Sequence, residues 1–328
     1  MSFKRLDPED FLISADSITA GAWSENSPTL TAFYTSSIQE NSVSGQYYLN
    51  VYQTASLDTT ADVQFNLAYA DQSGSGSAPY DGGIVGKSPT STIYGQWQNI
   101  VLGDENSNFV FGGTTPTKQN LAIISVNRSK YKGNLLPGTM TLTLNDGSNT
   151  LELTDNSRDV SSISFNEAGR VFQMLSGSAG ITEGTTTSFG LFLPDVGAII
   201  LSGDQLETEL TNLTWSDAVD GSANNNQTFF NLISNGSLFT LNSQESITSD
   251  YVFVRARNSE YNYSENPSFI SGSTGEVIYD DFINAPQTFI TTVGMYNDNN
   301  ELLAVAKLSK PLKKDFTKEA LIRVKLDF

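Results

Sequence analysis

The chain of 328 residues carries 36 acidic and 18 basic side chains, and it has no cysteine and no histidine. Without these two residue types it cannot form disulfides, cysteine-based metal sites or the Ser-His and Cys-His pairs of nucleophilic enzymes. The net charge of −18 disfavours binding to nucleic acid phosphates. Only 16% of residues are charged, and Ser, Thr, Asn and Gly, which are typical of β-sheets and turns, supply the remaining polarity. We therefore expect a mainly β protein with antiparallel, sandwich-like sheets and a few short helices.

Residues 1–155 are predicted to form an N-terminal β domain. In "DVQFNLAYA" apolar side chains alternate with polar ones from Val63 to Tyr69, which indicates a half-buried strand. The segment "STIYGQWQNIVLGDENS" instead has the spacing of a short helix that brings Tyr94, Trp97 and Val101 together. The segment "GTMTLTLNDGSNTLELTDNS" predicts a β-hairpin around an Asp-Gly turn.

Residues 156–244 are predicted to form a mixed middle region. The segment "FNEAGRVFQML" fits a strand or a helix, and its pattern does not decide between them. The segment "FGLFLPDVGAIIL" predicts two core segments broken at Pro194-Asp195. Two further segments, "GDQLETELTNLTW" and "NNNQTFFNLISNG", are predicted to be short helices because each has Asn or Asp near its start.

Residues 245–328 are predicted to form a C-terminal β docking domain. Its strands are "SDYVFVRARNSEYNY", "TFITTVGMY", "ELLAVAKL" and "ALIRVKLDF", and a polar turn joins the second and third as a hairpin. The fourth segment alternates up to Phe328, so an unpaired strand here would be an adhesive edge. We expect it to pair within its own chain, and donation of the strand to a neighbouring copy is the alternative.

Charge is unevenly distributed along the sequence. From Lys307 to Phe328, seven basic and three acidic residues give a net charge of +4, whereas the other 306 residues carry 11 basic and 33 acidic residues and a net charge of −22. We interpret the basic end as a docking surface for an acidic partner or for another copy of the chain. A solvated strand face is the alternative. The candidate interface residues are Lys307, Lys310, Lys313, Lys314, Arg323, Lys325 and Phe328.

Acidic residues are the remaining source of catalytic or metal chemistry. Paired carboxylates of the glycosidase kind are conceivable at Asp280-Asp281, at Asp104-Glu105 and at Asp195, but solvation in turns is the expected reading of each. The clusters "NDNNE" and "SDAVDGSANNN" offer oxygen ligands for calcium, yet neither has the spacing of a calcium-binding loop. We therefore predict no enzyme activity, no catalytic residue, no cofactor and no metal ligand.

The C-terminal hairpin and several other segments of the chain have recognisable strand and turn motifs. The segment "FITTVGMYNDNNELLAVAKLSKPLKK" resembles tail-fibre and baseplate-associated proteins of tailed bacteriophages, in which a strand ending in Gly-(Leu/Met)-Tyr leads through an Asx-rich turn to a second strand. The segments "RLDPEDFLISADSITAGAWS", "QYYLNVYQT", "DYVFVRARNSEYNY" and "EALIRVKLDF" look like virion structural proteins of contractile-tailed phages, especially cyanophages. The resemblance implies a subunit of the tail or baseplate and maps no functional residue onto the chain.

The resemblance and the composition together suggest a location and partners. The start of the chain has no apolar run of signal-peptide length, and runs such as "LAII" and "AIIL" are too short to span a membrane. We expect a virion protein assembled in the host cytoplasm, with other virion proteins and copies of itself as partners and with neither nucleic acid nor membrane among them. Two alternatives stay open: a capsid-decorating or neck protein, and a glycan-binding tail component.

Overall fold

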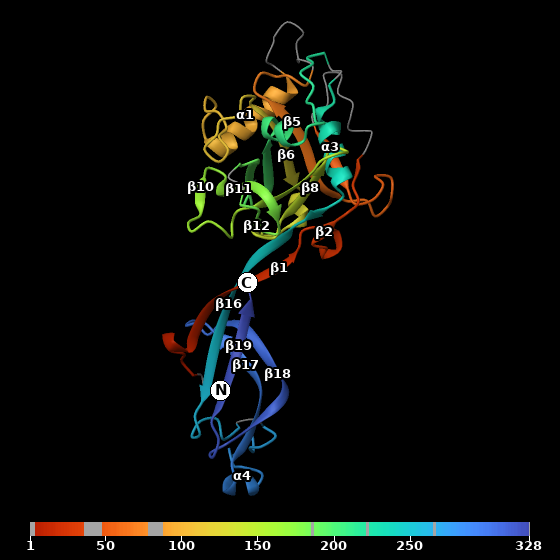
Figure 1. The fold of residues 1–328 in the computed structure, drawn as a ribbon. Coiled ribbons are helices and arrows are strands. Elements are labelled where there is room, and N and C mark those ends of the chain that lie inside the picture. The colour runs from red at the N-terminus through yellow and green to blue at the C-terminus, as the bar shows by residue number, and fades with distance from the viewer. Residues whose placement is uncertain are drawn as a thin grey trace. The chain divides into compact units, whose positions relative to one another are not determined.

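The computed structural model describes residues 4–35, 48–77, 88–184, 187–220, 223–264 and 267–327. The chain divides into two compact units, which Figure 1 shows coloured along the sequence. Unit 1 combines Met1–Asp16 with Ser246–Phe328, and unit 2 is Ser17–Glu245. Both are built mainly from antiparallel strands, with a few helices, and this confirms the predicted fold class.

These units divide the chain differently from the three predicted regions. The predicted boundary at residues 244 and 245 lies one residue from the boundary between the units. The predicted boundary after residue 155 falls inside unit 2, directly after strand β9 (Thr150–Asp155). Strand β9 pairs with β8 (Thr141–Asn145) and with β11 (Gly169–Ser178), so strand pairing joins the predicted N-terminal and middle regions in one sheet. Unit 1 also includes Met1–Asp16, which no sequence pattern had linked to the C-terminal end.

Unit 2 contains one large antiparallel sheet. Its strands in spatial order are β2 (Thr29–Leu30), β15 (Phe239–Thr240), β8, β9, β11, β13 (Gly190–Leu193), β14 (Ala198–Ser202), β6 (Asn120–Val126), β5 (Val63–Asp71), β4 (Leu49–Tyr52) and β3 (Tyr34–Thr35). Two short strands, β10 (Ser164–Asn166) and β12 (Ile181–Thr182), also pair with β11.

Local sequence patterns explain the hairpins of this sheet. Strands β8 and β9 form the predicted hairpin, with Leu142 opposite Leu153 and with Gly147 at φ 95° in the turn. Glycine reaches this left-handed conformation without a Cβ clash. Strands β13 and β14 are the two core segments predicted on either side of Pro194-Asp195, and they pair as a hairpin. The segment that fitted a strand or a helix is β11.

The large sheet curls back on itself. Strands β15 and β5 are seven positions apart in the strand order, which would separate them by about 30 Å in a flat sheet. Nevertheless, the rings of Phe239 on β15 and Phe65 on β5 have centroids 5.5 Å apart. The side chain of Trp23 contacts both rings, with centroid distances of 4.8 Å to Phe239 and 5.8 Å to Phe65. Opposite ends of the sheet therefore share one core, which is the sandwich-like arrangement expected from the sequence.

Central strands of the sheet are buried on both faces. On β6 and β14, successive residues alternate between two hydrophobic clusters: Ile124 and Ile199 belong to one, and Ile123 and Ile200 belong to the other. Two such faces explain why these strands read as continuous apolar runs in the sequence.

Three helices of unit 2 cover this sheet and lie where the sequence predicted helices. They are α1 (Pro89–Leu102), α2 (Gly203–Glu209) and α3 (Asn225–Gly236). Helix α1, orange in Figure 1, brings Tyr94, Trp97 and Val101 into the second cluster, as predicted. Each helix begins with a side-chain cap: Ser88, Ser202 and Asn224 accept from the main-chain N–H three residues later.

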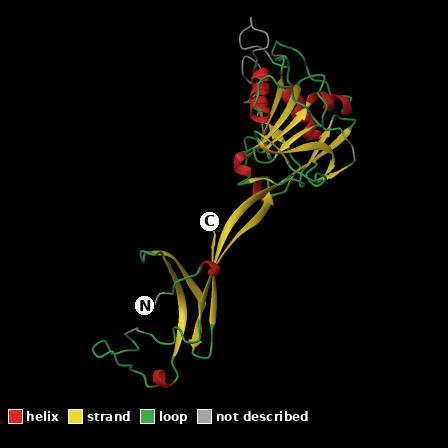
Figure 2. Ribbon diagram, turned by 90° about the vertical axis from the view of Figure 1, so that its left-hand side faces the viewer, coloured by secondary structure: helices red, strands yellow, loops and turns green. Residues whose placement is uncertain are grey.

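Unit 1 is built around long strands. Strand β16 (Asn242–Ala256) lies between β1 (Phe11–Gly21) and β19 (Ala320–Asp327), and the chain passes between the units within β1 and within β16. A separate hairpin consists of β17 (Gln287–Tyr296) and β18 (Leu302–Asp315). Figure 2 shows unit 1 almost wholly as strand and loop, whereas most of the helices lie in unit 2. The remaining short elements in the described ranges are η1 (Pro8–Asp10), η2 (Ser24–Asn26), η4 (Arg128–Lys130), β7 (Asn134–Leu135) and α4 (Asp281–Asn284).

The last strand pairs within its own chain. Eight residues of β19 lie opposite eight residues of β16, from Ala320 against Ala256 to Asp327 against Ser249. The alternation predicted for this strand is present, since Ala320 and Val324 are buried whereas Arg323 and Lys325 are exposed. The expectation of pairing within the chain is confirmed for the described residues of this strand.

Candidate interaction surface

Three of the candidate interface lysines lie on strand β18 of the hairpin. The side chains of Lys307, Lys310 and Lys313, which we call the lysine row, are all exposed. Lys307 is opposite Thr292, and Lys313 is opposite Phe289, with its Nζ 3.8 Å from a carboxylate oxygen of Asp315. No other ion pair is present on the lysine row within the described residues, so these cations face solvent in the single chain.

Two further candidates lie on one face of strand β19. The guanidinium of Arg323 lies 5.4 Å from the ring centre of Tyr251, and the ammonium of Lys325 lies 5.9 Å from the same centre. Lys325 also forms an ion pair with Asp327 at 3.0 Å. The hydrogen bond from Lys325 and another from Ser249 lower the pKa of Asp327 below its ordinary value, the Ser249 bond having the larger effect. Charges on this strand are therefore partly neutralised by neighbours. The last candidate, Phe328, lies outside the described residues.

Lys314 does not belong to this exposed surface, and its inclusion among the interface residues is corrected. Its side chain is fully buried, and its ammonium group donates to the main-chain oxygens of Asn258 (3.0 Å) and Asp315 (3.0 Å) and to the side-chain oxygen of Asn262 (2.8 Å). Three acceptors match the three N–H bonds of a lysine. Lys314 therefore anchors the hairpin to the segment 258–262. The charge pattern missed this because it treats Lys313 and Lys314 alike, whereas adjacent residues of a strand point to opposite faces.

The hairpin also exposes apolar side chains that the charge analysis did not select. We call Phe289, Leu302, Leu303 and Val305 the hairpin surface. Their relative exposures are 59%, 53%, 67% and 58%, respectively. A solvated strand normally alternates apolar with polar side chains, but "LLAVA" at the start of β18 has no polar residue. That run was visible in the sequence and is the signal that could have identified this surface.

Unit 1 as a whole has little interior of its own. Neither of the two hydrophobic clusters includes a described residue of this unit. Within the described parts of unit 1, the buried residues are Ser249, Val252, Ala256, Lys314, Ala320 and Val324. Other large apolar side chains of the unit are exposed, including Ile13 on β1 and Leu321 on β19, at 72% and 66%. Unit 1 thus presents apolar surface of the kind that marks protein interaction sites.

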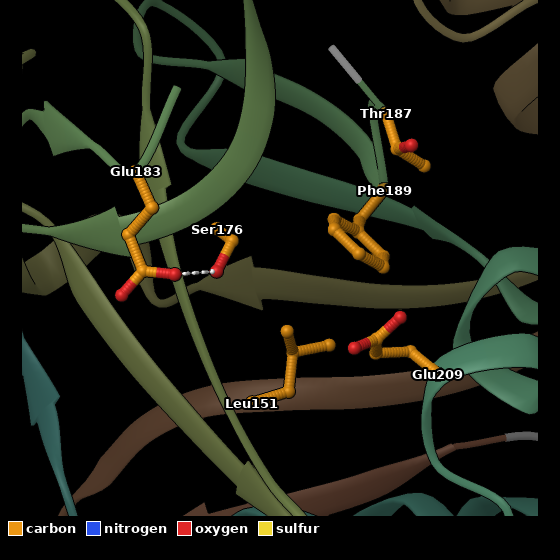
Figure 3. Close-up of a pocket in the computed structure, with 6 residues that line it drawn as sticks. All are labelled: Leu151, Ser176, Glu183, Thr187, Phe189 and Glu209. Atoms are coloured by element: carbon orange, nitrogen blue, oxygen red, sulfur yellow. Dashed lines mark hydrogen bonds between the residues drawn. The ribbon is translucent and has the colours of Figure 1, made fainter. Parts of the chain in front are cut away.

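Unit 2 contains a small hollow, shown in Figure 3. Its volume is about 170 Å³, below the roughly 300 Å³ at which small-molecule sites begin. The residues that line it are Leu151, Ser176, Glu183, Thr187, Phe189 and Glu209. Figure 3 shows the two carboxylates on opposite sides of Leu151 and Phe189, and one of them, on Glu183, accepts a hydrogen bond of 2.8 Å from Ser176. None of the acidic residues considered from the sequence lines the hollow.

Two of those acidic residues, Asp195 and Asp104, bind neighbouring donors instead. The carboxylate of Asp195 binds the side chain of Arg170 at 2.5 Å and also its main-chain N–H at 2.8 Å. Partial burial raises the pKa of Asp195, but the bonds from Arg170 outweigh burial and leave this pKa below its ordinary value. The carboxylate of Asp104 accepts from the Ser107 hydroxyl at 2.6 Å and from the Asn106 main chain at 3.0 Å, and these bonds lower its pKa.

Within the described ranges, no three acidic side chains are grouped closely enough to hold a metal ion. Among the helices that the structure describes, none combines the length and the apolar character that crossing a membrane requires.

Comparison with known proteins adds no relative. No protein-family model, no curated protein and no solved structure matches the chain.

Proposed function

We propose that this protein is a non-enzymatic structural subunit of a tailed-phage virion, located in the tail or baseplate. The observation that carries the proposal is the contrast between the units: unit 2 has two hydrophobic clusters, whereas unit 1 exposes the hairpin surface and has few buried side chains. In a chain with this division, one part folds around its own hydrophobic core, and the other buries its apolar side chains only when it contacts another protein. Such a division suits a subunit of a larger assembly.

The resemblance to phage proteins coincides with this surface. The segment "FITTVGMYNDNNELLAVAKLSKPLKK" runs through β17, the turn and most of β18. In the turn, the side chain of Asn297 accepts from the main-chain N–H groups of Asn299 and Glu301, at 3.0 and 2.8 Å. The Asx-rich turn therefore has a structural role, because it closes the hairpin that carries the exposed residues.

The non-enzymatic character is supported by the chemistry of the chain. Without histidine or cysteine, the chain lacks the commonest general base and the commonest activated nucleophile, and carboxylates are the main acid–base groups left near neutral pH. Candidates such as Asp195 and Asp104 are engaged with neighbouring donors. These engagements favour a structural role for them.

Immunogold electron microscopy of particles of the phage that encodes this chain tests the location. Antibodies against the purified chain are expected to label the distal end of the tail. Label over the head shell or at the junction of head and tail would favour the capsid-decorating or neck alternative. Particles that lack the chain altogether, by labelling and by mass spectrometry, would contradict a virion role.

A glycan-binding tail component is the second candidate, and one observation favours it. Sugar binding commonly uses an exposed aromatic ring near acidic groups. The three tryptophans are buried, and Trp23 and Trp215 donate their indole N–H to main-chain oxygens. Tyr279, however, is 55% exposed and directly precedes Asp280 and Asp281.

Binding of the purified chain to an array of host surface glycans separates the two candidates. The structural proposal expects no glycan to be retained. Retention that is lost in Tyr279→Ala but kept in Tyr263→Ala, a change at another exposed tyrosine of unit 1, would establish the glycan-binding alternative.

A further inference from the structure

We propose that copies of this chain associate with one another through unit 1, with the hairpin surface of one copy covered by unit 1 of another. This inference names the partner of the surface on which the proposed function relies. It goes beyond the basic docking strand expected from the sequence, because it places the contact on apolar side chains and makes the chain its own partner.

The hairpin is expected to be stable only when a protein surface packs against it. Strands β17 and β18 pair only with each other among the described residues, and a hairpin on its own is marginally stable in water. Both faces of β18 are apolar near the turn. Leu303 and Val305 lie on one face, and Ala304 and Ala306 lie on the other, with Ala306 opposite Val293. Because neither face is polar, at least one needs a protein surface against it.

The net charges of the two units favour unit 1 over unit 2 as the surface through which two copies contact each other. Unit 2 contains seven basic and 21 acidic residues, a net charge of −14. Two such units repel each other at close approach. Unit 1 contains 11 basic and 15 acidic residues, a net charge of −4. Unit 1 therefore approaches another unit 1 with little repulsion.

Opposite charges alternate along unit 1, which makes its surface complementary to itself. Basic and acidic side chains are neighbours in the ion pairs Arg255–Glu319 (2.9 Å) and Lys325–Asp327 (3.0 Å). On the hairpin, the lysine row lies along β18 while Asp298 and Glu301 lie at the turn. In a two-fold symmetric contact, each patch of one copy meets a different patch of the other, so the lysines of either copy can face acids of its partner.

The apolar face of β18, not its edge, forms the contact. Lysines and proline on an edge strand disfavour the addition of a further strand. Strand β18 has the lysine row and also Pro311, which lies where residues 308–311 form an irregularity opposite Thr291. These features protect the edge of β18 and leave its apolar face, with Leu303 and Val305, as the contact.

Solution mass of the full chain tests the inference. The wild-type protein is expected to have a mass of at least twice 35.6 kDa by light scattering after size-exclusion chromatography. The double change Leu303→Glu with Val305→Glu is expected to give a mass of 35.6 kDa, the monomer value. The matched control replaces two exposed apolar residues of unit 2, Leu57→Glu with Phe165→Glu, and is expected to keep the wild-type mass.

Folding of the two units is checked separately: hydrogen exchange of peptides from β16 and β19 reports on unit 1, and tryptophan fluorescence reports on unit 2. All three tryptophans, at positions 23, 97 and 215, lie in unit 2, so their fluorescence reports the folding of unit 2 without a contribution from unit 1. A variant that is monomeric with wild-type tryptophan fluorescence has lost association while unit 2 stays folded. Truncation before β19 is a poorer test, because β19 pairs with β16 and its removal damages the fold of unit 1.

A second measurement keeps the inference testable if the double variant misfolds. The chain has no cysteine, so Val305→Cys introduces a single thiol, and a maleimide is expected to label it more slowly at micromolar than at nanomolar protein concentration, because the contact covers it. Leu57→Cys is the matched control and is expected to be labelled at the same rate at both concentrations.

Two results would overturn the inference: a wild-type protein that is monomeric at micromolar concentration, or an association that only the unit 2 variants disrupt. Neither result bears on the location in the particle, which the immunogold experiment measures separately.

Discussion

The buried ammonium group of Lys314 lies 2.8 Å from the side-chain oxygen of Asn262, 52 residues earlier in the chain. This contact ties the hairpin to the loop that follows β16, in a unit with few other buried side chains. It shows that a lysine in a basic segment can act as an internal anchor while its neighbours face solvent.

Lys314→Met is expected to destabilise the hairpin by about 2 kcal/mol, because three oxygen acceptors lose a charged donor. Hydrogen exchange measured by mass spectrometry checks this, and peptides from β17 and β18 are expected to exchange faster than in the wild type. The matched control is Lys313→Met, which changes an exposed neighbour and leaves exchange nearly unchanged. Equal exchange in both variants would contradict the anchoring role.

The lysine row is expected to add a salt-dependent contribution to self-association. Replacing Lys307, Lys310 and Lys313 by Gln is expected to weaken association about 3- to 100-fold at low salt, since exposed ion pairs contribute about 0.2–1 kcal/mol each. Sedimentation measured at about 50 mM and about 500 mM NaCl checks this, because salt screens exposed charges over about 10 Å or less. The difference from the wild type should shrink at the higher concentration.

A charge change in unit 2 provides the control for this prediction. Lys132→Gln removes an exposed cation whose partner is Glu245, at 3.2 Å. It is expected to leave association unchanged at both salt concentrations. A triple variant that associates like the wild type would show that the lysine row takes no part in the contact.

Two glycines are expected to respond in opposite ways to substitution by alanine. A Cβ atom on Gly190 in β13 would lie 2.1 Å from the main-chain oxygen of Ile200 on the neighbouring strand, so Gly190→Ala should cost about 3 kcal/mol. A Cβ atom on Gly95 in α1 would meet nothing within 4 Å, so Gly95→Ala should stabilise unit 2 by up to about 1 kcal/mol. Urea unfolding followed by tryptophan fluorescence measures both. A destabilised Gly95→Ala protein would mean that this part of α1 is packed more tightly than the structure shows.

The ion pair of Asp195 and Arg170 is expected to make the free energy of unfolding depend on pH. The folded pKa of Asp195 lies below its ordinary value of 3.8, so the unfolded state binds the proton more readily. The contribution is therefore present above about pH 4 and is lost as the pH falls through the folded pKa. At pH 6 we expect Asp195→Asn to be less stable than the wild type by about 1 kcal/mol, and we expect this difference to shrink toward pH 3.

The same urea unfolding experiment, repeated across this pH range, measures the difference. Glu105→Gln, which changes an exposed acid in a turn of unit 2, serves as the control and is expected to follow the wild type throughout. A stability difference for Asp195→Asn that stays constant with pH would assign its effect to packing rather than to ionisation.

Local patterns by themselves determined most of the secondary structure. The spacing of Tyr94, Trp97 and Val101 predicted α1, and the alternation around the Asp146-Gly147 turn predicted the β8–β9 hairpin. These features depend on residues close together in sequence, through helical and strand periodicity and through turn chemistry. The segment of β11 stayed open because its apolar spacing fits both periods, and only pairing with β9 and β13 decided it.

Only the tertiary structure decided which surfaces are covered. It brings Met1–Asp16 to the C-terminal strands, buries Lys314 among distant oxygens, and leaves Leu303 and Val305 in solvent. Alternation in a sequence shows that two faces of a strand differ, but burial depends on what packs against each face, and that is set by segments hundreds of residues away. For the same reason the charge pattern indicated a basic end, and the sequence contained the apolar run beside it, but only the folded chain shows that this run stays exposed.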